Sequence, residues 1–160
     1  MQNQRGFTFI LVLFIVALMG AGLAITGDIW ATTRQREREA ELLFAGDAIR
    51  LAIAGYYNAS PGIVKQYPAQ LEHLLKDPRF PDTRRYLRQL YPDPFDKSSG
   101  WVEIKAPQGG IMGVASSSND APLKRTGFST ADRAFEDRAI RLKEKLRYRD
   151  WEFAYIPNQR

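Results

Sequence analysis

The fold is decided by the stretch FTFILVLFIVALMGAGLAITG, residues 7–27, which contains no charged side chain and is closed by Asp28. A helix of about 20 residues is roughly 30 Å long, which is the thickness of the hydrocarbon core of a bilayer. A secretory signal peptide has a shorter apolar region, of about 7–15 residues, followed by a small-residue cleavage site. The length of this stretch and the lack of such a site before Asp28 predict a membrane-spanning segment over residues 7–29.

The charges beside this segment give conflicting orientations. Arg5 and the terminal amine precede it, which favours a cytoplasmic N-terminus. Arg34, Arg36 and Arg38 follow it, and the positive-inside rule counts them toward the opposite orientation. Glutamates such as Glu37 alternate with these arginines at helical spacing and can pair with them. We expect a single-pass protein with a cytoplasmic N-terminus.

The composition argues against most enzyme classes. The chain has 160 residues, 23 Lys+Arg, 18 Asp+Glu, one His and no Cys, with a net charge of +5. Without Cys there is no thiolate metal site, disulfide or Cys nucleophile. The single His73 leaves little acid–base chemistry near neutral pH, and the sequence has no phosphate-binding glycine loop or G-x-S-x-G nucleophile motif. We expect a protein that is not an enzyme.

The helix is predicted to continue well beyond the apolar stretch. Residues 31–57 contain no Pro and are rich in Ala, Leu, Glu and Arg, all good helix formers. Apolar side chains recur at helical spacing, namely Leu42, Ala45, Ile49, Ile53 and Tyr56. The part before Leu42 is polar all round, which predicts a stretch that crosses solvent or lies in the interfacial zone of a membrane. The sequence NASPG, residues 58–62, ends the helix, so residues 30–58 form the soluble half of a spine that covers 7–57.

The remaining residues, 59–160, are predicted to form a small α+β head. A short Leu-rich helix is expected at 67–75, with Leu71, Leu74 and Leu75 on one face. Alternating or apolar runs predict strands at 101–104, 111–116 and 151–156, with a turn at Gly109–Gly110. A three- or four-stranded antiparallel sheet packed on the long helix would hide one face of each.

A further helix is predicted over 132–149, which carries more basic than acidic side chains. Its cations form a possible partner surface, and we single out Arg138, Arg141, Lys145 and Arg149. A basic helix can contact anionic lipid, nucleic acid or an acidic protein face. No nucleic-acid motif or aromatic-lined groove accompanies it, so we expect the partner to be an acidic face on a neighbouring subunit rather than nucleic acid.

The N-terminal sequence Arg5-Gly6-Phe7-Thr8-Phe9-Ile10 places a short basic leader and a Gly-Phe step directly before the apolar helix. This resembles the class III signal of type IV pilins and type II secretion pseudopilins. The resemblance implies that a prepilin peptidase cleaves between Gly6 and Phe7 and methylates the new N-terminal Phe7. Loss of the leader, residues 1–6, would lower the net charge from +5 to +4 because Arg5 is removed.

A second block, residues 67–96, is similar to general secretion pathway G-type pseudopilins. It opens with Tyr67-Pro68, continues with a Leu-rich helix, and matches the family passage "YL…LP.DPW" with Tyr86-Leu87, Leu90 and Pro92-Asp93-Pro94-Phe95. The resemblance implies a pilin-like layout, with a periplasmic head on a long helix in the bacterial inner membrane. It also implies three kinds of partner: other pilin subunits, the prepilin peptidase and the inner-membrane assembly platform.

The sequence departs from this family at the fifth mature position, where Leu11 replaces the usual Glu. In the family that Glu is thought to meet the N-terminal amine of a neighbouring subunit, and its absence is typical of some minor subunits. Gly20 and Gly22 weaken the helix locally. In this helix they would provide the local flexibility that a nearby proline usually provides in the family.

Calcium is a further point of comparison, because major pseudopilins bind it with acidic and carbonyl oxygens in the loop after the strands. Here that region reads SSSND, residues 116–120, and holds one carboxylate, Asp120. Asp93 and Asp96 are the other candidate ligands. Calcium prefers six to eight oxygens, several of them charged, so we expect no bound metal and no other cofactor.

Two functions follow from these observations. The first is a pseudopilin or minor pilin, built by helix packing into a filament of a secretion system, a pilus or a DNA-uptake system. The second is an uncleaved, membrane-anchored periplasmic binding module that uses the basic helix over 132–149 as its contact surface. Cleavage after Gly6 distinguishes them, since only the first requires it.

Overall fold

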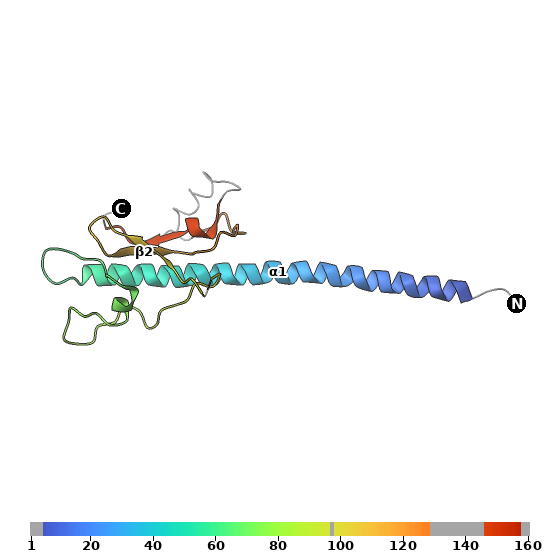
Figure 1. Cartoon of the computed structure of the whole chain (residues 1–160), viewed down its shortest axis with the longest axis horizontal. Coiled ribbons are helices and arrows are strands. Elements are labelled where there is room, and N and C mark those ends of the chain that lie inside the picture. The colour runs from blue at the N-terminus through green and yellow to red at the C-terminus, as the bar shows by residue number, and fades with distance from the viewer. Residues whose placement is uncertain (1–4, 97, 129–145, 158–160) are drawn as a thin grey trace. The chain divides into compact units, whose positions relative to one another are not determined.

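The computed structural model describes residues 5–96, 98–128 and 146–157, and for residues 5–6 and 21–29 it describes the helical backbone alone. The elements are α1 (Arg5–Asn58), η1 (Leu71–Leu74), β1 (Val102–Lys105), β2 (Ile111–Ala115), η4 (Tyr148–Asp150) and β3 (Glu152–Ala154) (Figure 1). The content is therefore α+β, with helices and a small antiparallel sheet. The chain divides into two compact units, residues 1–37 and 38–160, which are described separately.

The long helix is confirmed, and it ends where the sequence predicts. α1 comprises 54 residues and stops at Asn58. The amide of Ala59 still donates to the Gly55 carbonyl at 3.0 Å, after which Pro61 cannot continue the helix. Gly62 has φ +84°, a left-handed conformation that favours glycine, and it turns the chain away.

In the first unit, every side chain described between residues 7 and 20 is exposed. The large apolar ones range from 45% exposure for Ile15 to 72% for Phe7. This stretch contains no charge, and we call it the apolar segment. Among the residues whose side chains the structure describes, no helix combines the length and the apolar character needed to cross a membrane.

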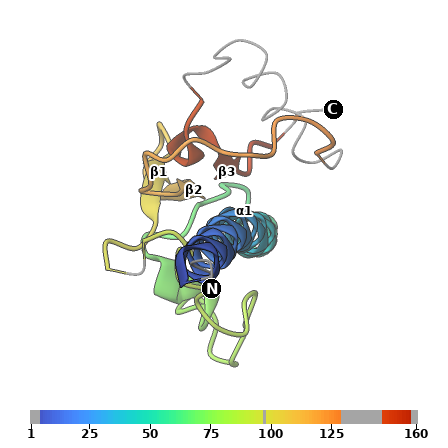
Figure 2. The same cartoon turned by 90° about the vertical axis from the view of Figure 1, so that its right-hand side faces the viewer.

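In the second unit, one face of α1 forms the core. The five positions predicted from helical spacing are all buried, with exposures of 0–4%: Leu42, Ala45, Ile49, Ile53 and Tyr56. All of them except Ala45 belong to one core cluster with buried side chains from the sheet and the C-terminal segment, including Ile111, Val114, Trp151 and Phe153. Figures 1 and 2 show the sheet on one side of this part of α1 and the segment around η1 on the other.

The sheet has three strands in the order β1-β2-β3, and both pairings are antiparallel. Val102 pairs with Ala115, and Gly113 pairs with Ala154. The register between β1 and β2 shifts at Ile104/Lys105, which marks an irregularity of the bulge type. The sequence-predicted strands are confirmed in place. The first is shifted by one residue, to 102–105, and the second and third are shorter by one and three residues, at 111–115 and 152–154.

The hairpin between β1 and β2 turns on the predicted Gly109–Gly110. Both residues have positive φ, at +90° and +82°. A Cβ on Gly110 would lie 2.8 Å from the Cβ of Tyr67, so a larger residue there would clash as well as strain the backbone. Glycine is therefore required at this position for two independent reasons.

The short helix predicted over 67–75 is only one 3-10 turn, η1. Leu74 is fully buried, whereas Leu71 and Leu75 are half-buried against the core. The carbonyl of Leu74 accepts the amides of Tyr86 and Leu87, at 2.9 Å and 3.1 Å. That carbonyl is therefore committed to a later segment, and the turn does not extend into an α-helix.

Sheet and helix approach each other most closely at Gly46. A Cβ built on Gly46 would overlap the ring of Phe153, which is fully buried in β3. Glycine at this point of α1 lets the aromatic ring lie directly on the helix backbone. The close packing of β3 on α1 therefore depends on a position without a side chain.

The basic helix predicted over 132–149 lies mostly outside the described residues. Of its described end, Leu146 is buried and Arg147 has an extended backbone, with φ −127° and ψ 161°. Tyr148 then begins the 3-10 helix η4. The prediction of an α-helix is therefore wrong for residues 146–149, because Leu146, Tyr148 and Trp151 all turn into the core.

Candidate functional site

The residues predicted for processing and assembly lie at the start of α1. Gly6 has a helical backbone, and Phe7 is 72% exposed. Leu11 is exposed within the apolar segment, and a Cβ on Gly20 would have open space around it. Leader residues 1–4 lie outside the described residues, and for Gly22 only the helical backbone is described. The described side chains at this end of the helix are thus exposed, carry no charge and are apolar except for Thr8.

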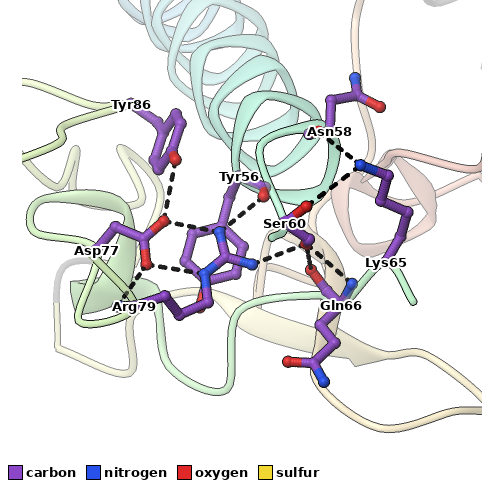
Figure 3. A network of polar contacts seen from close by, with 8 residues as sticks. All are labelled: Tyr56, Asn58, Ser60, Lys65, Gln66, Asp77, Arg79 and Tyr86. Carbon is purple, nitrogen blue, oxygen red and sulfur yellow. Dashed lines mark hydrogen bonds and ion pairs between the residues drawn. The ribbon is translucent and has the colours of Figure 1, made fainter. Parts of the chain in front are cut away.

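A second candidate lies at the C-terminal end of α1, where a polar network surrounds Arg79 (Figure 3). The Arg79 guanidinium binds the Asp77 carboxylate with two hydrogen bonds, Nη2 to Oδ2 at 2.7 Å and Nε to Oδ1 at 2.9 Å. Asp77 is 1% exposed and also accepts the hydroxyl of Tyr86 at 2.9 Å. A bidentate pair of this kind fixes geometry as well as charge.

The same guanidinium closes the end of the helix. Nη2 of Arg79 donates to the Tyr56 carbonyl at 2.9 Å, and Nη1 donates to Ser60 Oγ at 2.7 Å. Lys65 Nζ donates to the carbonyls of Asn58 and Ser60, at 3.0 Å and 3.3 Å. The last turn of α1 contains no basic residue of its own. Two cations from later in the chain therefore satisfy its orphan carbonyls and complement the negative end of its dipole.

The network shifts the titration of its members. Burial alone would raise the pKa of Asp77, but hydrogen bonds from Arg79 and Tyr86 outweigh burial and hold that pKa below its ordinary value. The hydrogen bond to Asp77 raises the pKa of Arg79 against the opposing effect of burial. Burial, and then the bond to Asp77, raise the pKa of Tyr86. Asp77 and Arg79 are thus held charged and Tyr86 neutral at neutral pH.

Asp77, Arg79 and Tyr86 bond to one another. The Arg79 guanidinium lies 3.5 Å from the centroid of the Tyr56 ring, so its face is covered too. His73 is half-buried, and its ring stacks beside Tyr56 at a centroid separation of 6.5 Å. The arrangement fixes a loop to the end of a helix.

The candidate calcium ligands Asp93 and Asp96 are joined through serines. Asp93 is fully buried, and its carboxylate accepts the amide of Phe95 at 2.9 Å, the hydroxyl of Ser116 at 2.7 Å and the amide of Ser117 at 3.1 Å. Asp96 Oδ2 accepts the Ser117 hydroxyl at 3.1 Å. Both carboxylates therefore already have protein donors that order the serine run.

Asp96 is bound most closely by its own loop. Its Oδ1 accepts the amide and the hydroxyl of Ser98 and the amide of Ser99, at 3.1, 2.6 and 3.1 Å. These bonds lower the pKa of Asp96. The third candidate, Asp120, is exposed, and its carbonyl accepts the amide of Tyr148 at 3.1 Å. Across the residues described, no three His, Cys, Asp or Glu side chains are grouped to hold a metal ion.

A buried carboxylate, Glu39, was not predicted from the sequence. It is 3% exposed, and its Oε1 accepts the amides of Leu123 and Lys124, at 2.5 Å and 3.2 Å, and the Tyr148 hydroxyl at 2.9 Å. The expectation that the helix before Leu42 lies in solvent or in the interfacial zone of a membrane is therefore wrong at this residue. The available signal was spacing, because Glu39 lies three residues before Leu42 on the buried face.

The predicted partner surface is described only in part. Arg138, Arg141 and Lys145 lie outside the described residues. Arg149 is exposed, and its Nη1 donates to Asn119 Oδ1 at 3.1 Å. The described residues thus place one of these four side chains at the surface, beside the serine-rich loop.

No protein-family model, curated protein or solved structure matches the chain. The resemblance to pilin-like subunits therefore rests on the residues of this sequence alone, in the blocks 5–57 and 67–96. Function has to be inferred from those residues and from the geometry described above.

Proposed function

We propose that the chain is a pilin-like structural subunit, a pseudopilin or minor pilin, that joins its neighbours through the apolar segment of α1. The observation that carries the proposal is the contrast in exposure along one continuous helix. Apolar side chains from Phe7 to Met19 are all exposed, whereas one face of the later part of α1 is buried in the head, and only single side chains such as Phe44 and Leu51 stay exposed there. The buried face is formed by Leu42, Ala45, Ile49, Ile53 and Tyr56. Among the described residues, the side chains of the apolar segment stay exposed and so can contact partners.

Assembly replaces the lipid around the apolar segment with the helices of neighbouring subunits. Before assembly, lipid covers the apolar segment and the helix anchors the chain in the inner membrane, with the head in the periplasm. In a filament, the same side chains pack against the helices of neighbouring subunits. Lipid is as apolar as these side chains, so association depends on close packing rather than on the hydrophobic effect.

Leu11 bears on the position of the subunit in such a filament. A carboxylate inside hydrocarbon costs several kcal/mol unless it is paired, so a family that keeps one uses it. Leu11 makes no such pair and is 47% exposed within the apolar segment. We therefore assign the chain to a minor or terminal position, where no subunit above needs that contact.

Mass spectrometry of the intact protein and its N-terminal peptide, made in the native host, tests this proposal. A mature chain that begins at methylated Phe7 is the expected result. A Gly6→Val variant should stay full length, whereas the control Gly20→Val should be processed normally. A wild-type chain that retains Met1 would refute processing and favour the uncleaved, anchored binding module.

A further inference from the structure

The segment 76–88, which we call the basic loop, concentrates unpaired positive charge on the surface of the second unit. Its exposed cations are Lys76, Arg84, Arg85 and Arg88. Within the described part of the chain, none of these four forms an ion pair. The loop contains two acidic residues, Asp77 and Asp82, of which only Asp82 is exposed. The accessible charge of the loop is therefore strongly positive.

Backbone hydrogen bonds close the basic loop at its base. The Asp77 amide donates to the Arg84 carbonyl at 3.0 Å, and the amides of Tyr86 and Leu87 both donate to the Leu74 carbonyl. Leu87 is 6% exposed and anchors this end in the core. The cations therefore lie on a loop whose two ends are joined by hydrogen bonds and anchored in the core.

The ion pair of Asp77 and Arg79 fixes the conformation of this loop. A buried ion pair is a weak source of stability, because desolvation offsets most of the attraction. Here it ties the start of the loop to Tyr56 and Ser60 at the end of α1 (Figure 3). Arg84 is also held, since its guanidinium lies 4.0 Å from the centroid of the Phe80 ring. Ordering these groups in advance reduces the entropy lost when a partner binds.

We infer that the basic loop is a docking surface for a carboxylate-rich face of a protein partner. The planar guanidinium groups of Arg84, Arg85 and Arg88 match carboxylates in a two-bonded geometry. The surface is separate from the apolar segment, and its role does not depend on cleavage at Gly6. It provides the head with a contact of its own, in addition to packing through the helix.

Two features favour a protein over nucleic acid as the partner. Single-stranded nucleic acid is bound on open aromatic faces, but the ring of Phe80 is half-buried and already covered by Arg84. Asp82 is exposed between the cations and would repel a continuous row of phosphates. A protein face of mixed but mainly acidic charge can pair Asp82 with a cation of its own.

The test measures the binding of a fluorescent peptide of alternating Glu and Gly to the full chain in non-ionic detergent. The loop variant is Arg84→Gln/Arg85→Gln/Arg88→Gln. Its control is Arg34→Gln/Arg36→Gln/Arg38→Gln, which removes equal charge from exposed positions of α1. We expect about tenfold weaker binding for the loop variant alone, because exposed charge pairs each contribute modestly. Raising the salt from about 20 mM to about 200 mM should reduce this difference.

Three outcomes would overturn the inference. Equal losses in the two variants would mean that the peptide responds to net charge alone. A wild-type chain that shows no binding at low salt would mean that the loop is simply solvated. A DNA duplex that binds more tightly than the peptide, and loses affinity in the loop variant, would identify nucleic acid as the partner. Circular dichroism of both variants checks that the fold is retained.

Discussion

The two halves of α1 show how differently apolar residues can be used in one helix. In the first half they run without interruption, and all those described from Phe7 to Met19 are exposed. In the second half the buried ones recur about every three or four residues, and Leu42, Ile49 and Ile53 are 0% exposed. A continuous apolar surface has no preferred face, whereas a periodic one selects the side that packs on the sheet.

This difference indicates what covers the apolar side chains in each half of α1. The periodic half is covered by its own chain, so its apolar residues contribute to the stability of the head. The continuous half has no covering among the described residues of its own unit. Its contribution is expected to be to association with lipid or neighbouring subunits. Paired substitutions in the two halves can therefore separate folding from assembly.

The largest effect is expected for Ile49→Ala. Ile49 is fully buried, so the truncation should lower the free energy of unfolding by about 2–5 kcal/mol. The matched change Ile15→Ala affects a side chain that is 45% exposed and should leave unfolding nearly unchanged. Urea unfolding of the full chain in detergent, followed by tryptophan fluorescence, measures both. A similar loss in the two variants would show that the apolar segment also stabilises the head.

The second largest loss of stability is expected for Glu39→Ala. The change leaves two amides and the Tyr148 hydroxyl without their acceptor, at a cost of about 1–3 kcal/mol in unfolding free energy. Glu41 is exposed two residues later, so Glu41→Ala is the control and should have little effect. Equal stability of Glu39→Ala and the wild type would contradict the buried role of this carboxylate.

Gly46→Ala and Gly20→Ala should change the stability of the protein in opposite directions. Alanine is favoured over glycine in a helix by about 1 kcal/mol, so Gly20→Ala should stabilise α1 or be neutral. At Gly46 the added methyl meets the buried Phe153 ring, and overpacking of about 1–3 kcal/mol should outweigh the helical gain. Thermal melts by circular dichroism report both changes. Stabilisation by Gly46→Ala would mean that β3 moves away from α1 at little cost.

The smallest effect concerns acid stability. Because the pKa of Asp77 is lowered in the folded state, its contribution is complete above the unfolded value of 3.8 and is lost as the pH falls through the folded-state value. Asp77→Asn should therefore flatten the decline of the melting temperature below about pH 4. Asp96 acts in the same direction, so some decline should remain. A variant with the wild-type pH profile would show that the ion pair contributes nothing.

Much of the fold could be predicted because it is encoded locally. The spacing of Leu42, Ala45 and Ile49 predicts the buried face of α1, and Pro61 with Gly62 marks its end. Gly109–Gly110 identifies the hairpin, and the alternation around Val102 and Phe153 places strands to within a few residues. Each of these patterns depends on neighbours in sequence, which is why a single sequence is enough to read them.

The polar contacts could not be predicted because they join distant parts of the chain. Glu39 bonds to Tyr148, and Arg79 bonds to the carbonyl of Tyr56. No local pattern shows that a glutamate among arginines is buried, or which arginine will reach the end of a helix. Ser116 and Ser117 look like a flexible loop in the sequence, yet the carboxylate of Asp93 orders them.

The register shift at Ile104/Lys105 is relevant to aggregation of this protein through the edges of its sheet. An outer strand with free backbone groups can act as a template on which further chains add, and this leads to aggregation. Here the outer strands are four and three residues long, and the irregularity falls at the end of β1, beside the charged pair Lys105 and Glu103. The sheet therefore offers little backbone to which the strand of another chain could pair.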